Sequence, residues 1–351
     1  MLVLARAPAS AFAVRGNLYK LLFIQRAASS GFMANAHVFP GGVIDKHDED
    51  EGWKQSNTIA AARGGASVKP GSYPFRSDKR DSLAMRICAL RELFEETGVL
   101  MARPNAAPAA SSSPSPVASS PLTSSVHSFP SLAAQRAAQK ASSASAASLR
   151  PLLSSLGLAF EPHKLAPWSR WITPVFERRR YDTLFYLAAL EAPVTTLTLD
   201  PAEVAEVRWL SPVEALDLAR RREIVLPPPT TYILRELEFV RTIEEVFAAA
   251  PDREMPAILP RLLPADAMPS EANAEAAAPM MHITLPGDPC YPLDDEGTLP
   301  STAHPMVSSQ QWHRMVRCGD AKVDPVTRIH RPAHMHLKPS PAEPPLANSK
   351  L

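Results

Sequence analysis

Residues 91–99 read RELFEETGV and close a longer segment, SLAMRICALRELFEETG at 82–98, whose large apolar side chains recur at helical spacing. The apolar positions of one helical face are Leu83, Ile87, Leu90 and Phe94. Asp81 or Ser82 can cap the start of such a helix, and Gly98 can stop its end. The stretch therefore predicts a helix with an apolar face and with both ends marked.

The other face of this helix carries acids. Glu92, Glu95 and Glu96 stand at positions i, i+3 and i+4, which brings three carboxylates within reach of one point. Like charges this close raise one another's pKa unless a cation neutralises them, and hard oxygen ligands suit Mg²⁺ or Mn²⁺. The alternative is an ordinary solvated face on which Arg91 and Glu95 form an ion pair.

An FPGG turn at 39–42 precedes the helix, and with REL-x-EE-x-GV it resembles the box of the Nudix hydrolases. That pattern runs Gly, five residues, Glu, seven residues, then Arg-Glu-U-x-Glu-Glu-x-Gly-U, with U bulky and aliphatic. The second half matches at every fixed position. Gly42 and Arg91 lie 49 positions apart, so about 35 extra residues interrupt the box, and counting back from Arg91 puts Leu83 where the first Glu belongs.

One branch of that family, the peroxisomal coenzyme A diphosphatases, is known for an insertion inside the box. The chain is similar to this branch in GFMANAHVFPGGVID, RRRYDTLFYLAAL, EVRWLSPVEAL and LPPPTTYILRELE. The resemblance covers most of residues 1–262 and implies the α/β class, as a Nudix α/β/α sandwich with a mixed β-sheet, interrupted by an insertion at 46–80.

The resemblance also implies the site. Glu92, Glu95 and Glu96 would bind the metal, Mg²⁺ or Mn²⁺, and Glu92 or Glu95 could also orient or deprotonate water. Arg91 would brace the turn, and Glu203 would supply a further catalytic acid. The alternative for Glu203 is an acid on a surface loop.

Substrate contacts are expected from the turn and from basic residues. Gly41 and Gly42 would approach the diphosphate, with the Gly42 carbonyl as a further metal ligand. Arg26 and the run at 178–180 could receive a 3′-phosphate, although a solvated strand edge explains at least two of the three arginines in the run. Asn35 stands where the coenzyme A signature usually has Gly.

The reaction implied is metal-dependent hydrolysis of coenzyme A or acyl-coenzyme A to 4′-phosphopantetheine, or its acyl form, and adenosine 3′,5′-bisphosphate. One alternative is the same chemistry on NADH or an RNA cap. Another is a Nudix-fold protein that binds a nucleotide without hydrolysing it, which Leu83 in place of the first Glu would favour.

Outside the box, three segments read as strands and two as helices. The strands are expected at 20–25, 168–176 and 181–190, and the helices at 211–221 and 227–248. The Ala, Ser and Pro-rich stretch at about 104–150 predicts a disordered insertion, because it has few large apolar side chains. Residues 263–351 form a poorly determined tail in which MHITLP and QWHRMVRC can pair as a small β appendage.

Composition limits the partners and the compartment. A net charge of +1 over 351 residues gives no basic footprint for nucleic acid, and no apolar run is long enough to cross a membrane. The terminal SKL at 349–351 is the signal that a peroxisomal import receptor binds, which predicts the peroxisomal matrix. The opening MLVLARAPASAFAVRG alternatively resembles a mitochondrial transit peptide, unless 2–5 begins the first strand.

Overall fold

The computed structural model describes 1–7, 16–31, 33–54, 81–104, 126–128, 149–250, 257–262, 280–286, 288, 291, 314–318 and 326–330. The expected insertion at 46–80 lies outside the described residues from 55 onward. Most of the stretch at 104–150, expected to be disordered, and the terminal SKL at 349–351 also lie outside them.

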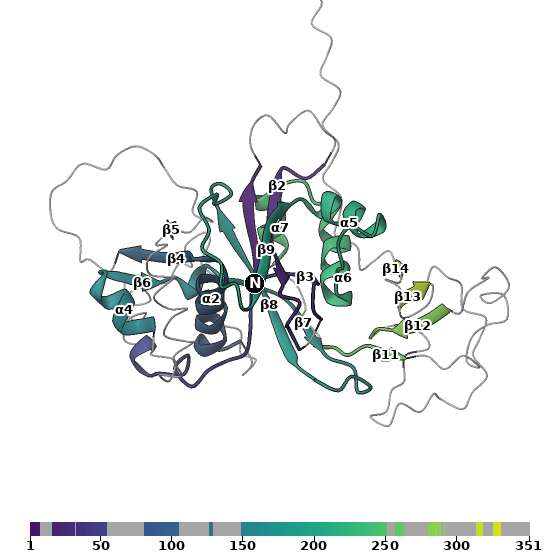
Figure 1. Cartoon of the computed structure of the whole chain (residues 1–351), viewed down its shortest axis with the longest axis horizontal. Coiled ribbons are helices and arrows are strands. Elements are labelled where there is room, and N and C mark those ends of the chain that lie inside the picture. Colours follow the sequence, from purple (N-terminus) through teal and green to yellow (C-terminus); the bar gives the residue numbers. More distant parts are fainter. Residues whose placement is uncertain are drawn as a thin grey trace, which may run out of the picture.

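A mixed sheet forms the centre of the molecule (Figure 1). Its strands are β1 (Leu2–Arg6), β2 (Tyr19–Arg26), β3 (His37–Val38), β7 (Ala166–Ile172), β8 (Asp182–Leu190), β9 (Val204–Leu210) and β10 (Ala257–Ile258). The order is β10-β7-β8-β1-β2-β3, and β9 pairs with β2. The pairs β1–β8 and β10–β7 are parallel and the others antiparallel.

Helices cover both faces of this sheet (Figure 1): α2 (Leu83–Thr97) on one, and α5 (Pro212–Arg220), α6 (Pro228–Leu237) and α7 (Ile243–Ala249) on the other. Strand β1 shows why two layers are needed. Leu2 and Leu4 pack into the core under α6 and α7, whereas Val3 and Ala5 pack into the core under α2. Successive side chains of a strand point to opposite faces, so a strand apolar at every position needs cover on both. The expected α/β/α sandwich is confirmed.

The sequence signals for α2 are confirmed at both ends. The Ser82 side chain accepts a hydrogen bond from the Met85 backbone N–H at 3.3 Å. Gly98 has a φ of 74° and donates its N–H to the Phe94 carbonyl at 2.8 Å. A Cβ on Gly98 would also lie 3.1 Å from the Thr198 nitrogen, so both conformation and space favour glycine.

A small sheet and a short helix extend the α2 side of the molecule. They are β4 (Val99–Pro104), β5 (Val126–Ser128), β6 (Leu158–Phe160), α4 (Leu149–Ser155) and the 3₁₀ turn η2 (Pro162–Lys164). Strand β5 falls within the stretch expected to be disordered, and α4 begins at its end. The β5 backbone pairs with β4, which satisfies its hydrogen-bonding groups and explains this difference.

The single helix expected over 227–248 is wrong, because α6 and α7 are separate helices. Thr242 caps α7 by accepting a hydrogen bond from the Glu245 N–H, and the Glu245 carboxylate accepts one from the Thr242 N–H. The Asn17 side-chain amide donates to the carbonyls of Leu237 and Val240 at 3.0 and 2.6 Å. These contacts satisfy backbone groups that a continuous helix would use itself.

The hairpin β7–β8 also differs from expectation. Strand β7 ends at Ile172, before Pro174, whereas the sequence suggested a strand as far as Phe176. Residues 173–181 form the turn of the hairpin, closed at its base by a hydrogen bond from the Thr173 N–H to the Tyr181 carbonyl at 2.9 Å.

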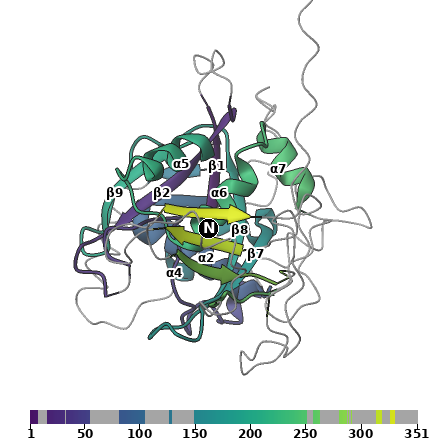
Figure 2. The same ribbon diagram turned by 90° about the vertical axis from the view of Figure 1, so that its right-hand side faces the viewer.

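A second antiparallel sheet lies beside α6 (Figures 1 and 2). Its strands are β11 (Arg261–Leu262), β12 (Met280–Thr284), β13 (Arg314–Cys318) and β14 (Val326–His330). Ile283 packs with Trp171 and Tyr232, which joins this sheet to the main domain. Because β11 pairs with β12, the sheet spans the boundary expected after 262. No helix in the described ranges is long and apolar enough to cross a bilayer.

Candidate active site

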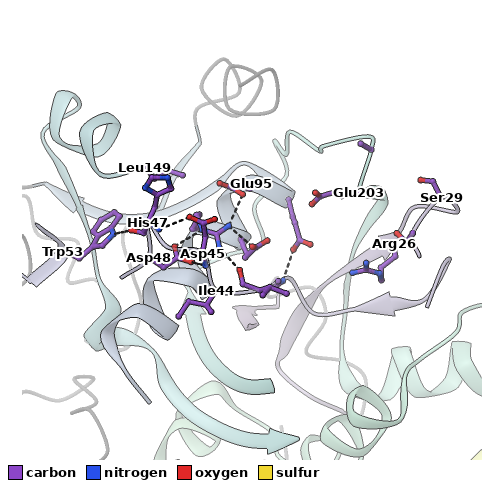
Figure 3. A pocket seen from close by; sticks show the side chains of 18 residues that line it. Arg26, Ser29, Ile44, Asp45, His47, Asp48, Trp53, Glu95, Leu149 and Glu203 are labelled. Carbon is purple, nitrogen blue, oxygen red and sulfur yellow. Dashed lines mark hydrogen bonds and ion pairs between the residues drawn. The ribbon is translucent and has the colours of Figure 1, made fainter. Parts of the chain in front are cut away.

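A cavity of about 640 Å³ opens where the turn after β3 meets the C-terminal half of α2 (Figure 3). Its lining residues are Arg26, Ser29, Ser30, Gly41, Gly42, Val43, Ile44, Asp45, His47, Asp48, Trp53, Arg91, Glu92, Glu95, Glu96, Leu149, Ala202 and Glu203. Every site residue that the sequence singled out lines this one cavity, apart from the arginine run at 178–180.

Arg91 lies at the centre of the acidic residues. Its Nε and Nη2 donate to the two carboxylate oxygens of Asp48 at 2.8 and 2.9 Å. Its Nη1 donates to Glu92 at 2.7 Å and to Glu95 at 3.2 Å, and its Nη2 also donates to the Val43 carbonyl at 3.1 Å. The guanidinium therefore ties α2 to the segment that follows the FPGG turn.

Asp48 is a site residue that counting back from Arg91 missed. Five residues separate it from Gly42, which is the spacing of the first acid in the Nudix pattern when the count runs forward from Gly. The assignment of that position to Leu83 is therefore wrong, and the extra residues lie after Asp48. Its carboxylate, 2% exposed, forms the paired contact with Arg91 that a glutamate at this position could also make.

The two glycines let the turn approach the helix closely. The Gly41 N–H donates to the Glu96 carboxylate at 2.9 Å. A Cβ built on Gly42 would lie 2.5 Å from the carboxyl carbon of Glu92, so a larger residue would displace that side chain. The FPGG turn is thus fitted against two of the three acids of the helix.

The cluster has an excess of negative charge. Asp48, Glu92, Glu95 and Glu96 are all buried, and the first three form ion pairs with Arg91. Burial, followed by the charge of Glu92, raises the pKa of Glu96 to about 8. Burial alone would lower the pKa of Arg91, but its carboxylate partners, led by Asp48, raise it above its usual value.

This donor set fits a hard divalent cation, because carboxylate oxygens suit such ions and added positive charge would offset the repulsion among the acids. In the described residues, no three acids, histidines or cysteines are already gathered at metal-binding geometry. Instead, Arg91 holds Glu92 and Glu95 by ion pairs, so a bound cation would compete with Arg91 for their oxygens.

Glu203 and Arg26 stand on the side of the cavity away from Asp48 (Figure 3). Glu203 is exposed, and its charge contributes to raising the pKa of Glu96. Its carbonyl accepts a hydrogen bond from the Ala27 N–H at 2.9 Å, which fixes the loop before β9 next to the end of β2. Glu203 is therefore a surface acid that faces the buried cluster.

Asn35 stands where the coenzyme A signature usually has glycine, and it adopts a backbone conformation that glycine also adopts. Its φ is 61°, in the left-handed region that glycine adopts freely and asparagine tolerates better than most residues. The loop between β2 and β3 can therefore keep the same course with either residue.

Comparison with known proteins identifies the family to which the chain belongs. Residues 1–237 match the family model described as the NUDT19 Nudix domain. The chain belongs to the Nudix hydrolase family. Among its Nudix relatives, the acyl-coenzyme A diphosphatase NUDT19 of Gallus gallus is 34% identical over 297 residues, covering 80% of this chain and 75% of that protein. The Homo sapiens protein of the same name is 32% identical over 324 residues, covering 85% and 80%.

A solved structure agrees on the Nudix fold. The crystal structure of a Nudix hydrolase from Alicyclobacillus acidocaldarius covers 72% of this chain and 98% of that one, with a TM-score of 0.50 and 21% sequence identity. The chain is thus a Nudix enzyme, and the residues matched by the family model include every residue of the cavity described above.

Proposed function

We propose that this Nudix hydrolase cleaves the diphosphate of coenzyme A or acyl-coenzyme A. The products would be 4′-phosphopantetheine, or its acyl form, and adenosine 3′,5′-bisphosphate. The observation that carries the proposal is the buried cluster of Asp48, Glu92, Glu95 and Glu96 around Arg91, at the floor of the cavity. The substrate class rests on the relatives, which are named acyl-coenzyme A diphosphatases.

Nudix hydrolases generally need a divalent metal ion, and we propose Mg²⁺ or Mn²⁺ held by Glu92, Glu95 and Glu96. When bound, such an ion supplies positive charge to the diphosphate and a water of lowered pKa. Both ions accept carboxylate oxygens, so the donor set suits either.

The protein's own groups would then position the reaction. Arg91 holds Glu92 and Glu95 on the cavity side of α2, and Gly41 and Gly42 line the same cavity, where their backbone could approach a phosphate. Glu203 faces the cluster from the opposite side and is placed to accept a proton from the attacking water. Arg26 lines the same side and is suited to bind a phosphate oxygen.

The decisive experiment is an assay of the purified protein with coenzyme A and added Mg²⁺ or Mn²⁺, beside NADH and capped RNA. Glu95→Gln keeps the shape of the side chain but removes its charge, so turnover should fall at least about 100-fold with the fold intact. Glu223→Gln, an exposed acid outside the cavity, is the matched control and should stay fully active.

Each outcome of that assay has a distinct meaning. Metal-dependent release of adenosine 3′,5′-bisphosphate, lost in Glu95→Gln, would support both reaction and substrate. Faster turnover of NADH or capped RNA would replace the substrate and keep the chemistry. No turnover of any of the three would favour a nucleotide-binding protein without activity, although Asp48 removes the argument for that alternative drawn from Leu83.

We also propose that the enzyme resides in the peroxisomal matrix, delivered by an import receptor that binds the terminal SKL at 349–351. Mitochondrial targeting would require the opening residues to serve as a transit peptide. Those residues include β1, which lies between β2 and β8 in the central sheet, so their removal on import would cost a fully buried strand.

A further inference from the structure

A second cavity, of about 670 Å³, continues from the first. Arg26, Gly41, Gly42, Val43 and Ile44 line both, so the two meet at the turn where the diphosphate would lie. The two cavities differ in character. The first is lined by acids, whereas the second, here called the apolar groove, runs between the β2–β3 loop and the turn of the β7–β8 hairpin. Its volume is that of a small-molecule site, roughly 300–1,000 Å³.

Exposed apolar side chains gather along this groove. Met33, Ile44, Phe176 and Tyr181 line it, and their exposed fractions are 39%, 39%, 50% and 38%. Large apolar side chains left this accessible around a single concave surface mark a binding site more often than an accident of packing. The groove therefore suits the apolar part of a ligand whose charged part lies at Gly41 and Gly42.

The turn that carries Phe176 and Tyr181 is held in place. The Tyr181 N–H donates to the Thr173 hydroxyl at 3.0 Å, and the Arg180 Nε donates to the Thr173 carbonyl at 3.1 Å. The Arg179 guanidinium lies against Gly31 of the facing loop, 3.1 Å from where a Cβ would stand. The Arg180 guanidinium thus contacts the backbone at the base of the turn, and the Arg179 guanidinium lies beside the facing loop.

Part of the groove comes from outside the matched Nudix domain. Pro260 and Ile283 line it, and both follow residue 237, where the match to the family model ends. Ile283 belongs to β12 and packs with Trp171, which also lines the groove. The second sheet thus completes a surface that begins at the hydrolytic site.

We propose that the apolar groove receives the acyl-pantetheine arm of the substrate, and that Phe176 and Tyr181 make the enzyme prefer long acyl thioesters to free coenzyme A. The inference rests on the proposed function, because it presumes a diphosphate bound at Gly41 and Gly42. An arm leaving the diphosphate there enters the groove directly, and each methylene of an acyl chain that it covers adds to binding.

The test compares kcat/KM for free, hexanoyl- and lauroyl-coenzyme A and for 3′-dephospho-coenzyme A, with the full-length chain. In the wild type, kcat/KM should rise about two- to fourfold for each covered methylene. Phe176→Ser should remove most of that rise, so that kcat/KM falls much more for lauroyl-coenzyme A than for free coenzyme A. Phe239→Ser, at another exposed phenylalanine that lines neither cavity, is the control and should keep the rise.

Two results would overturn the inference. One is a wild-type kcat/KM that does not depend on chain length, or a dependence that survives Phe176→Ser. The other is a Phe176→Ser enzyme whose discrimination between coenzyme A and its 3′-dephospho form changes instead, which would place the nucleotide end in the groove. Failure of the proposed function itself looks different, because no coenzyme A species would then be hydrolysed at all.

Discussion

Asp48 and Arg91 form a buried ion pair with two hydrogen bonds, and Arg91 extends from it to Glu92 and Glu95. Removing the charge of Asp48 would leave Arg91 short of one of its buried partners. We expect Asp48→Asn to lower the free energy of unfolding by about 3 kcal/mol and to reduce turnover. Chemical denaturation and the coenzyme A assay would measure the two effects.

Asp48→Glu is the matched variant for this prediction, since the family pattern has Glu at that position. It keeps the charge and should retain most of the stability and activity. Wild-type stability in Asp48→Asn would contradict a bracing role for this residue.

The raised pKa of Glu96 predicts how stability depends on pH. A carboxyl group with a pKa of about 8 in the folded protein and an ordinary pKa of 4.5 binds its proton more tightly when folded. Its stabilising contribution is complete below the unfolded value and is lost as the pH rises through about 8. In EDTA, the wild type should therefore lose about 3 kcal/mol relative to Glu96→Gln between pH 5.5 and 8.5.

Added Mg²⁺ or Mn²⁺ should stabilise the protein more at high pH than at low pH, which is opposite to the trend in EDTA. Ligands must be deprotonated to bind a cation, so the increase in melting temperature on adding metal should grow with pH in the wild type. Glu96→Gln should show a smaller increase with little pH dependence. A metal effect that is the same in both proteins at every pH would remove Glu96 from the proposed ligands.

At the scale of elements, the break between α6 and α7 depends on Asn17. Its amide N–H groups donate to carbonyls that end α6, and the isosteric Asn17→Asp variant cannot donate. We expect this variant to lose about 1–3 kcal/mol of stability, since the carbonyls of Leu237 and Val240 each lose a hydrogen-bond donor. Thermal unfolding would measure the loss. A variant as stable as the wild type would show that the capping box at Thr242 is sufficient.

The elements that the sequence predicted are those with local signals. Helix α2 carries its apolar face, its N-cap and its glycine stop within 17 residues, and its three acids follow from the same spacing. The break after α6 has one local signal, the capping pair of Thr242 and Glu245, but its other contact, from Asn17 to Leu237, spans 220 residues. Asp48 could have been identified from the sequence, but only by counting forward from Gly42. Its contact with Arg91 spans 43 residues and has no local signal.

At the scale of the whole molecule, we expect the proposed targeting signal to act independently of catalysis. The terminal SKL at 349–351 lies far along the chain from every residue that lines the hydrolytic cavity. Deleting these three residues should leave turnover unchanged and leave a fluorescently tagged protein in the cytosol, as imaging beside a peroxisomal marker would show. Continued import without them would mean that another part of the chain carries the address.

The interrupted box also has a practical consequence. Its two halves are joined by the side chains of Asp48 and Arg91, which contact each other across 43 residues of sequence. Loop closure becomes costlier only slowly as a connection lengthens, so we expect foreign sequence inserted between the two halves to cost little stability. A domain that folds only when it binds a ligand, placed there, would strain the contact between Asp48 and Arg91. Such an insertion offers a route to a hydrolase whose activity a ligand controls.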